Sequence, residues 1–194
     1  MNITQYLLSA ALAAVLSFTS AGASAQASSD AAAIDIGESK LALTDVMKAA
    51  DFSSAIKVVK GKPGYGDVMV LITDPQCPYC RSMHNTMKGL DNVTIYVLMV
   101  NSLGPKSAEI NRKVWCSPNR VAAYETAWNG GAGSLPEASC KTEVIDSLRA
   151  RLRQLPEWRA VPAMAFLGGR FINGEASASE IKQEIAMGKI SVQK

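Results

Sequence analysis

The chain has 194 residues, with 20 basic and 17 acidic side chains and a formal net charge of +3. A charge so close to balance argues against binding to nucleic acid and against electrostatic attachment to a membrane surface. Beyond an apolar N-terminal segment there is no run of 18 apolar residues, which argues against a transmembrane helix in the rest of the chain.

The N-terminal segment has the features of a secretory signal peptide. Residues 1–25 carry no charged side chain, contain an apolar run from Leu7 to Phe18 and end in Ala23-Ser24-Ala25. A short apolar core followed by a small-x-small site is typical of a cleaved signal. We therefore expect residues 1–25 to be removed on export.

Residues 26–54 are predicted to form a leader and a short linker-like helix. The first of them are small and polar, whereas apolar residues recur at helical spacing between Leu41 and Phe52. The domain that follows is expected to span residues 55–194.

From residue 55 onward the pattern predicts a mixed α/β domain. Strands are expected over 55–60, 68–73 and 93–100, with a turn at 61–66 and a helix from Pro78 to about Lys88. The runs VMVLIT and VTIYVLMV are apolar at nearly every position, which is typical of strands covered on both faces. The order strand, helix, strand predicts a parallel βαβ unit.

The second half is predicted to begin with helical and irregular structure over about 105–155. Within it, Arg149, Arg151 and Arg153 lie off an apolar stripe and are expected to form a solvated face. A strand over 163–167, a Gly-Gly turn and a return strand over 170–173 are expected next. The sequence from Ser177 to Glu180 is a capping box that predicts the start of a last helix.

The motif CPYC, from Cys77 to Cys80, is open to several interpretations. A c-type haem site needs His directly after the second cysteine, where this chain has Arg81. A structural zinc site usually has two closely spaced ligand pairs, whereas Cys116 and Cys140 are far apart, so no metal is expected. A purely structural disulfide within CPYC would close a very small loop and contribute little, but it remains an alternative in an exported protein.

A redox role has direct physical support, because the motif lies between a buried strand and a helix. Cys77 would be the N-cap and Pro78 the first helical residue, where its missing N–H has no cost. The free N–H groups and the helix dipole would stabilise a thiolate on Cys77. Cys80, one turn later and more buried, would serve as the resolving thiol.

Cys116 and Cys140 enclose 23 residues rich in small and polar types. A disulfide between them would stabilise the fold by about 3–4 kcal/mol in the loop-entropy model. We interpret this second pair as structural.

The chain resembles the catalytic domain of the bacterial periplasmic disulfide isomerases DsbC and DsbG. The resemblance covers roughly residues 40–190 and rests on an ordered set of motifs: LITDPQCPYCR followed by His84, then VWC ending at Cys116, SC ending at Cys140, and VPA from Val161 to Ala163. It implies a thioredoxin fold with a helical insertion at about 105–155, a structural Cys116–Cys140 disulfide and no cofactor. It also implies a cis-proline at Pro162 that exposes the backbone of Val161 to a substrate strand.

The chain departs from this family at two places. The family usually has Thr before the cis-proline, where this chain has Val161, so the redox potential cannot be carried over. Family members also have an N-terminal dimerisation domain, for which residues 26–54 are too few. We therefore expect a monomer, although the apolar face of the helix at 41–52 offers a surface for pairing with a second copy.

These features predict a periplasmic thiol:disulfide oxidoreductase that acts as an isomerase or reductase on secreted clients with disulfides. The resemblance implies a membrane reductase of the DsbD type as its redox partner. One alternative is a monomeric disulfide oxidase with a DsbB-type partner. Another is a non-enzymatic protein, either a chaperone or a copper-binding protein, the latter suggested by eight methionines. Four of these, however, stand where core residues are expected: Met69, Met83, Met87 and Met99.

His84 is the single histidine and has two interpretations. It follows Cys77 by seven residues, so it would share a helix face with Cys77 and could act as a base. The favoured interpretation is a polar residue on the helix surface that adds a positive charge near the motif.

Overall fold

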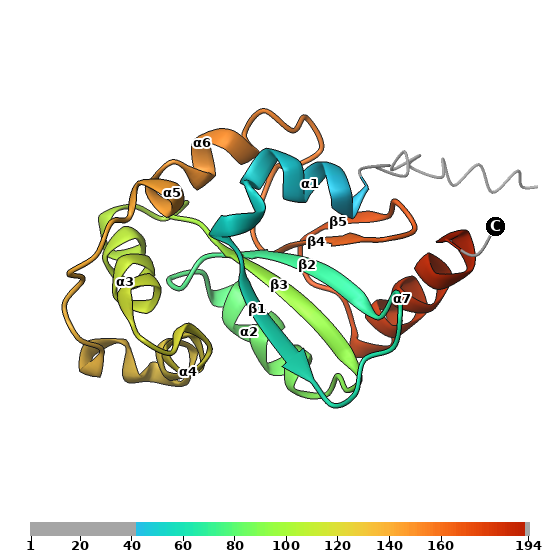
Figure 1. Cartoon of the computed structure of the whole chain (residues 1–194), viewed down its shortest axis with the longest axis horizontal. Helices are drawn as coiled ribbons and strands as arrows, with labels where there is room; N and C mark the ends of the chain where they lie inside the picture. Colours follow the sequence, from blue (N-terminus) through green and yellow to red (C-terminus); the bar gives the residue numbers. More distant parts are fainter. Residues whose placement is uncertain (1–41, 193–194) are drawn as a thin grey trace, which may run out of the picture. The chain divides into compact units, whose positions relative to one another are not determined.

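The computed structural model describes residues 42–192 (Figure 1). The predicted signal peptide and the leader up to residue 41 lie outside the described residues. Five strands form one sheet, namely β1 (Ile56–Lys60), β2 (Val68–Thr73), β3 (Val93–Met99), β4 (Ala163–Phe166) and β5 (Phe171–Asn173). The α-helices are α1 (Leu43–Ala50), α2 (Pro78–Lys88), α3 (Pro105–Cys116), α4 (Arg120–Thr126), α5 (Glu143–Asp146), α6 (Leu148–Leu152) and α7 (Ala178–Val192). The structure also has short helical turns at η1 (Phe52–Ser54), η2 (Ala127–Gly131) and η3 (Ala132–Ser134).

The strand order is β1-β3-β2-β4-β5. β2 and β3 are parallel and joined by α2, which confirms the predicted βαβ unit, and the other neighbouring strands are antiparallel. This arrangement brings the end of β2, which is separated from CPYC by three residues, next to the start of β4.

Side chains of the central strands alternate between two apolar clusters. Met69 and Leu71 of β2 belong to the first cluster, with residues of α2 and α7. Val70 and Ile72 belong to the second cluster, with residues of α1 and α6. Figure 1 shows α1 and α6 on one side of the sheet and α2 on the other. Because successive strand residues point to opposite faces, the unbroken apolar run of β2 fits a sheet that is covered on both faces.

The helix α1 belongs to this packed domain, which corrects the boundary expected at residue 55. Its apolar residues, Leu43, Val46, Met47 and Ala50, are buried in the second cluster against β2, β4 and α6. Since that face is occupied by the protein's own sheet, it is not available for pairing with a second copy.

Arg151 of α6 also differs from the solvated face expected for it. Its Nη2 atom donates to the carbonyl oxygens of Ala50, at 2.6 Å, and Val144, at 2.8 Å. The guanidinium group thereby supplies donors to carbonyls near the ends of α1 and α5, which lack partners within their helices.

The predicted helical insertion is present as the elements from α3 to α6, and the last helix begins with the predicted capping box. The N–H of Ser177 donates to Glu180 Oε2 at 2.9 Å, and the N–H of Glu180 donates to Ser177 Oγ at 3.2 Å. Within residues 42–192, no helix is both long enough and apolar enough to cross a membrane.

Candidate active site

The CPYC motif begins at the N-terminus of α2. Cys77 has extended backbone angles and caps the helix, with Pro78 as the first helical residue. The N–H of Cys80 donates to Cys77 Sγ at 3.4 Å. A thiolate at this position is therefore close to a backbone donor and to the positive end of the helix dipole.

Cys80 has a more enclosed environment than Cys77. Its side chain is 1% exposed, against 6% for Cys77, and both are free thiols. Burial raises the pKa of the Cys80 thiol to about 12, against the opposing effect of hydrogen bonds from Thr73 and from the N–H of Asp74. The two cysteines thus differ in the way that a nucleophile and a resolving thiol require.

The chain brings Val161, 84 residues beyond Cys77, and Pro162 to the same place. The peptide bond between them is cis, and Cys77 Sγ lies 3.5 Å from the carbonyl oxygen of Val161. Pro162 directly precedes β4, and β4 pairs with β2, so the sheet itself positions this loop beside the motif.

Asp74 is a residue of the site to which the sequence patterns assigned no role. Its side chain is fully buried, and its carboxylate accepts hydrogen bonds from the N–H groups of Gln76 and Leu103 and from Ser107 Oγ, at 2.7–2.9 Å. These bonds connect the active-site loop to the start of α3. A charged residue at the end of a continuous apolar strand was the available signal, because such a residue is rarely buried without partners.

The expectation that His84 lies on the helix surface is wrong. The residue is 4% exposed and stacks on Trp128, with ring centroids 5.7 Å apart. Its Nδ1 atom lies 3.3 Å from the hydroxyl of Tyr124, and Nε2 lies 3.3 Å from a carboxylate oxygen of Glu125. The helical insertion therefore covers the face of α2 on which His84 lies.

Burial lowers the pKa of His84; Glu125 opposes the shift, whereas Lys88 and Lys60 add to it. An unperturbed histidine titrates near pH 6.5, so His84 is neutral in the folded protein at neutral pH. It does not add a positive charge near the motif.

Lowering the pH should therefore destabilise the protein through His84. Below about pH 6.5 the imidazole of His84 is protonated in the unfolded chain. In the folded protein it stays neutral until the pH falls to its lowered pKa, so protonation favours the unfolded chain. The free energy of unfolding should fall in that window with a slope of at most about 1.4 kcal/mol per pH unit from this residue. Urea unfolding from pH 4.5 to 8 should show the slope in the wild type and a smaller one in His84→Gln.

Because His84 is the only histidine, one imidazole signal in the NMR spectrum reports its pKa directly. Equal slopes in the two proteins, together with a His84 pKa at or above that of a free histidine, would contradict the prediction.

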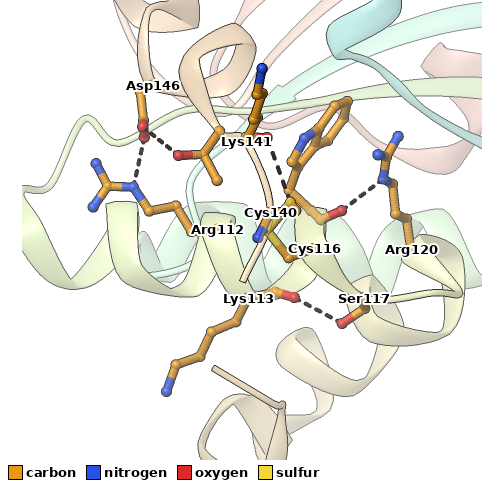
Figure 2. The surroundings of a disulfide bond; sticks show 10 residues. Arg112, Lys113, Cys116, Ser117, Arg120, Cys140, Lys141 and Asp146 are labelled. Atoms are coloured by element: carbon orange, nitrogen blue, oxygen red, sulfur yellow. Dashed lines mark hydrogen bonds and ion pairs between the residues drawn. A yellow bond between two sulfur atoms is a disulfide. The ribbon is translucent and has the colours of Figure 1, made fainter. Parts of the chain in front are cut away.

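The other two cysteines form a disulfide away from the motif. Cys116 ends α3, its Cα lies 5.4 Å from that of Cys140, and the N–H of Cys140 lies 3.3 Å from Cys116 Sγ. Figure 2 shows the surrounding contacts, including the ion pair between Arg112 Nε and Asp146 Oδ1 at 2.8 Å. The disulfide joins the irregular segment before α5 to α3, and the ion pair joins α5 itself to α3.

Comparison with known proteins agrees with this architecture. The family model described as Thioredoxin-like domain matches residues 52–189. A relative from Bordetella pertussis, named "Probable thiol:disulfide interchange protein DsbC", is 31% identical over 131 residues, which cover 68% of this chain and 45% of the relative. The chain thus spans less than half the length of that relative.

Two solved structures show the same fold at low sequence identity. A disulfide interchange protein from Neisseria gonorrhoeae is 22% identical, with a TM-score of 0.58 over 72% of this chain and 98% of that one. ScsC of Proteus mirabilis in a compact conformation is 13% identical, with a TM-score of 0.59 over 81% of this chain and 85% of that one. The expected thioredoxin fold is confirmed, and the chain belongs to the family of proteins with a thioredoxin-like domain.

Proposed function

We propose that the protein is an enzyme that exchanges thiols and disulfides in secreted client proteins, chiefly as a reductase and isomerase. The observation that carries this proposal is the position of Cys77, which caps α2 with its Sγ 3.5 Å from the carbonyl oxygen of Val161. The similarity to proteins named thiol:disulfide interchange protein DsbC supports the same reaction.

In the reductive direction, the Cys77 thiolate attacks one sulfur of a client disulfide. A mixed disulfide forms, and the other client sulfur leaves as a thiolate. Cys80 then loses its proton and attacks the Cys77 sulfur, which releases the second client thiolate and leaves a Cys77–Cys80 disulfide. The client gains two electrons, and the pair of thiols in CPYC loses two electrons.

The backbone of Val161, next to cis Pro162, is proposed to bind the client. An extended client segment that pairs with this backbone would bring its sulfur to Cys77, because Val161 and Cys77 are already in contact. Backbone pairing of this kind is largely independent of client sequence.

Steady turnover as a reductase or isomerase needs a source of electrons, which we assign to a membrane reductase of the DsbD type. A cysteine at a helix N-terminus, as Cys77 is, favours the reduced form of a redox pair in general and hence gives its disulfide oxidising power. This favours disulfide oxidation, with a DsbB-type partner, as the second candidate function.

We place the protein in the periplasm. The apolar segment and small-x-small site within residues 1–25 support export. The Cys116–Cys140 disulfide supports an oxidising compartment.

The test is reduction of insulin by the purified protein with dithiothreitol as electron source. We expect precipitation of the insulin B chain to be faster than with dithiothreitol alone, and scrambled ribonuclease to regain activity in a glutathione buffer. Failure to accelerate either reaction would refute the proposal. Rapid oxidation of a reduced peptide without isomerisation would select the oxidase.

A further inference from the structure

A hollow of about 250 Å³ lies beside the proposed client-binding loop. Its lining includes Val161 itself, together with Trp158 and the three arginines Arg149, Arg153 and Arg159. We call this feature the arginine hollow. It begins at the residue whose carbonyl oxygen is next to Cys77 Sγ.

The arginines of the hollow have no carboxylate partner of their own. Among residues 42–192, no ion pair involves Arg149, Arg153 or Arg159. Other arginines are bonded to the protein, since Arg151 donates to Ala50 and Val144 and Arg112 pairs with Asp146. Three unpaired guanidinium groups around one concave surface make it strongly positive, although the whole chain is nearly balanced in charge.

Trp158 gives the hollow a rigid apolar wall. Its ring packs against the second apolar cluster, which also holds α1 and α6. Its Nε1 atom is buried without a hydrogen-bond partner among the described residues. The hollow therefore combines charged donors and an apolar surface, a combination suited to an extended peptide that carries acidic side chains.

We propose that the arginine hollow binds Asp or Glu side chains that flank the reacting cysteine of the client, so that the protein prefers acidic client segments. This inference rests on the proposed function. A client docked at Val161 rises about 3.3 Å per residue when extended, so residues two to four positions from its cysteine would reach the hollow. An acidic segment is chosen over other occupants because its charge complements that of the unpaired guanidinium groups.

Two peptides that differ only in charge test the preference. Each substrate is a pair of identical peptides joined by one disulfide. The cysteine is flanked by three Asp in one substrate and by three Asn in the other. We expect kcat/KM for reduction to be roughly tenfold higher for the Asp peptide, as several exposed ion pairs together would produce. The ratio should fall as sodium chloride is raised from 0.05 to 0.5 M, because the interaction is screened.

The double variant Arg153→Gln/Arg159→Gln should bring the ratio to about one. Both residues are exposed, so their replacement should leave the fold intact, which circular dichroism verifies. Lys182→Gln is the matched control, since it removes a positive charge from a separate hollow near α7 and should retain the preference. A wild-type ratio near one, or a ratio unchanged in the double variant, overturns the proposal.

A binding measurement separates this inference from the proposed function. The anisotropy of a fluorescent Asp-rich peptide without cysteine measures binding to the arginine hollow, whether or not the protein reduces disulfides. Binding to the wild type that is lost in the double variant supports the hollow, and equal binding to both refutes it. Failure to reduce the Asn peptide counts against the proposed function alone.

Discussion

Replacement of Cys77 by alanine should reduce disulfide exchange to the uncatalysed rate. Cys80 cannot take over, because it is 1% exposed and its pKa is raised by burial to about 12. The thiolate is the reactive form, and a thiol with so high a pKa stays protonated at pH 8. The insulin assay measures the loss, and retained activity in Cys77→Ala would show that the roles are assigned to the wrong cysteines.

The matched variant Cys80→Ala should behave differently. It keeps the attacking thiolate but lacks the second thiol, so the protein should accumulate mixed disulfides with clients. These adducts appear on non-reducing gels and in intact-mass spectra. The control Cys77→Ala/Cys80→Ala should form none; adducts in that double variant would point to the second cysteine pair.

Replacing both Cys116 and Cys140 by alanine should lower the free energy of unfolding by about 3–4 kcal/mol. The disulfide closes a loop with a sequence separation of 24, and the segment before Cys140 lies exposed. The ion pair between Lys113 Nζ and Glu137 Oε1, at 2.7 Å, also joins this segment to α3, but an ion pair with so exposed a carboxylate contributes little. Urea unfolding measures the change.

The same variant should keep its exchange rate per folded molecule, because the disulfide lies outside the contacts of Cys77 and Cys80. As a control, reductant should lower the stability of the wild type to that of the variant and leave the variant unchanged. Loss of activity with the fold retained would place Cys116 and Cys140 in the mechanism.

Much of the fold follows from patterns that extend over only a few residues. The strand β2 and the helix α2 lie where the apolar run and the N-cap proline predict them, because alternation in strands and capping in helices depend on near neighbours. For the same reason Cys77 could be predicted as a helix cap, and the capping box of α7 appears at Ser177. Met69, Met83, Met87 and Met99 are all buried, as expected of core residues.

Contacts between distant segments could not be obtained in this way. The spacing on α2 places His84 on the side of Cys77 but says nothing of Tyr124 and Trp128, which arrive from the helical insertion and bury the imidazole. Similarly, the sequence predicts α1 as part of a linker, because it does not show that the apolar face of α1 packs against the sheet.

The three unpaired arginines of the hollow show the same limit. Arg149 and Arg151 stand two residues apart on α6, yet one lines the hollow and the other bonds to Ala50. Residues two apart on a helix point to different faces, and the distant segments that each face meets decide what its side chain contacts. Local periodicity determines the face on which a side chain lies, whereas the chain topology determines what that face meets, and so the charge and shape of the surface beside Cys77.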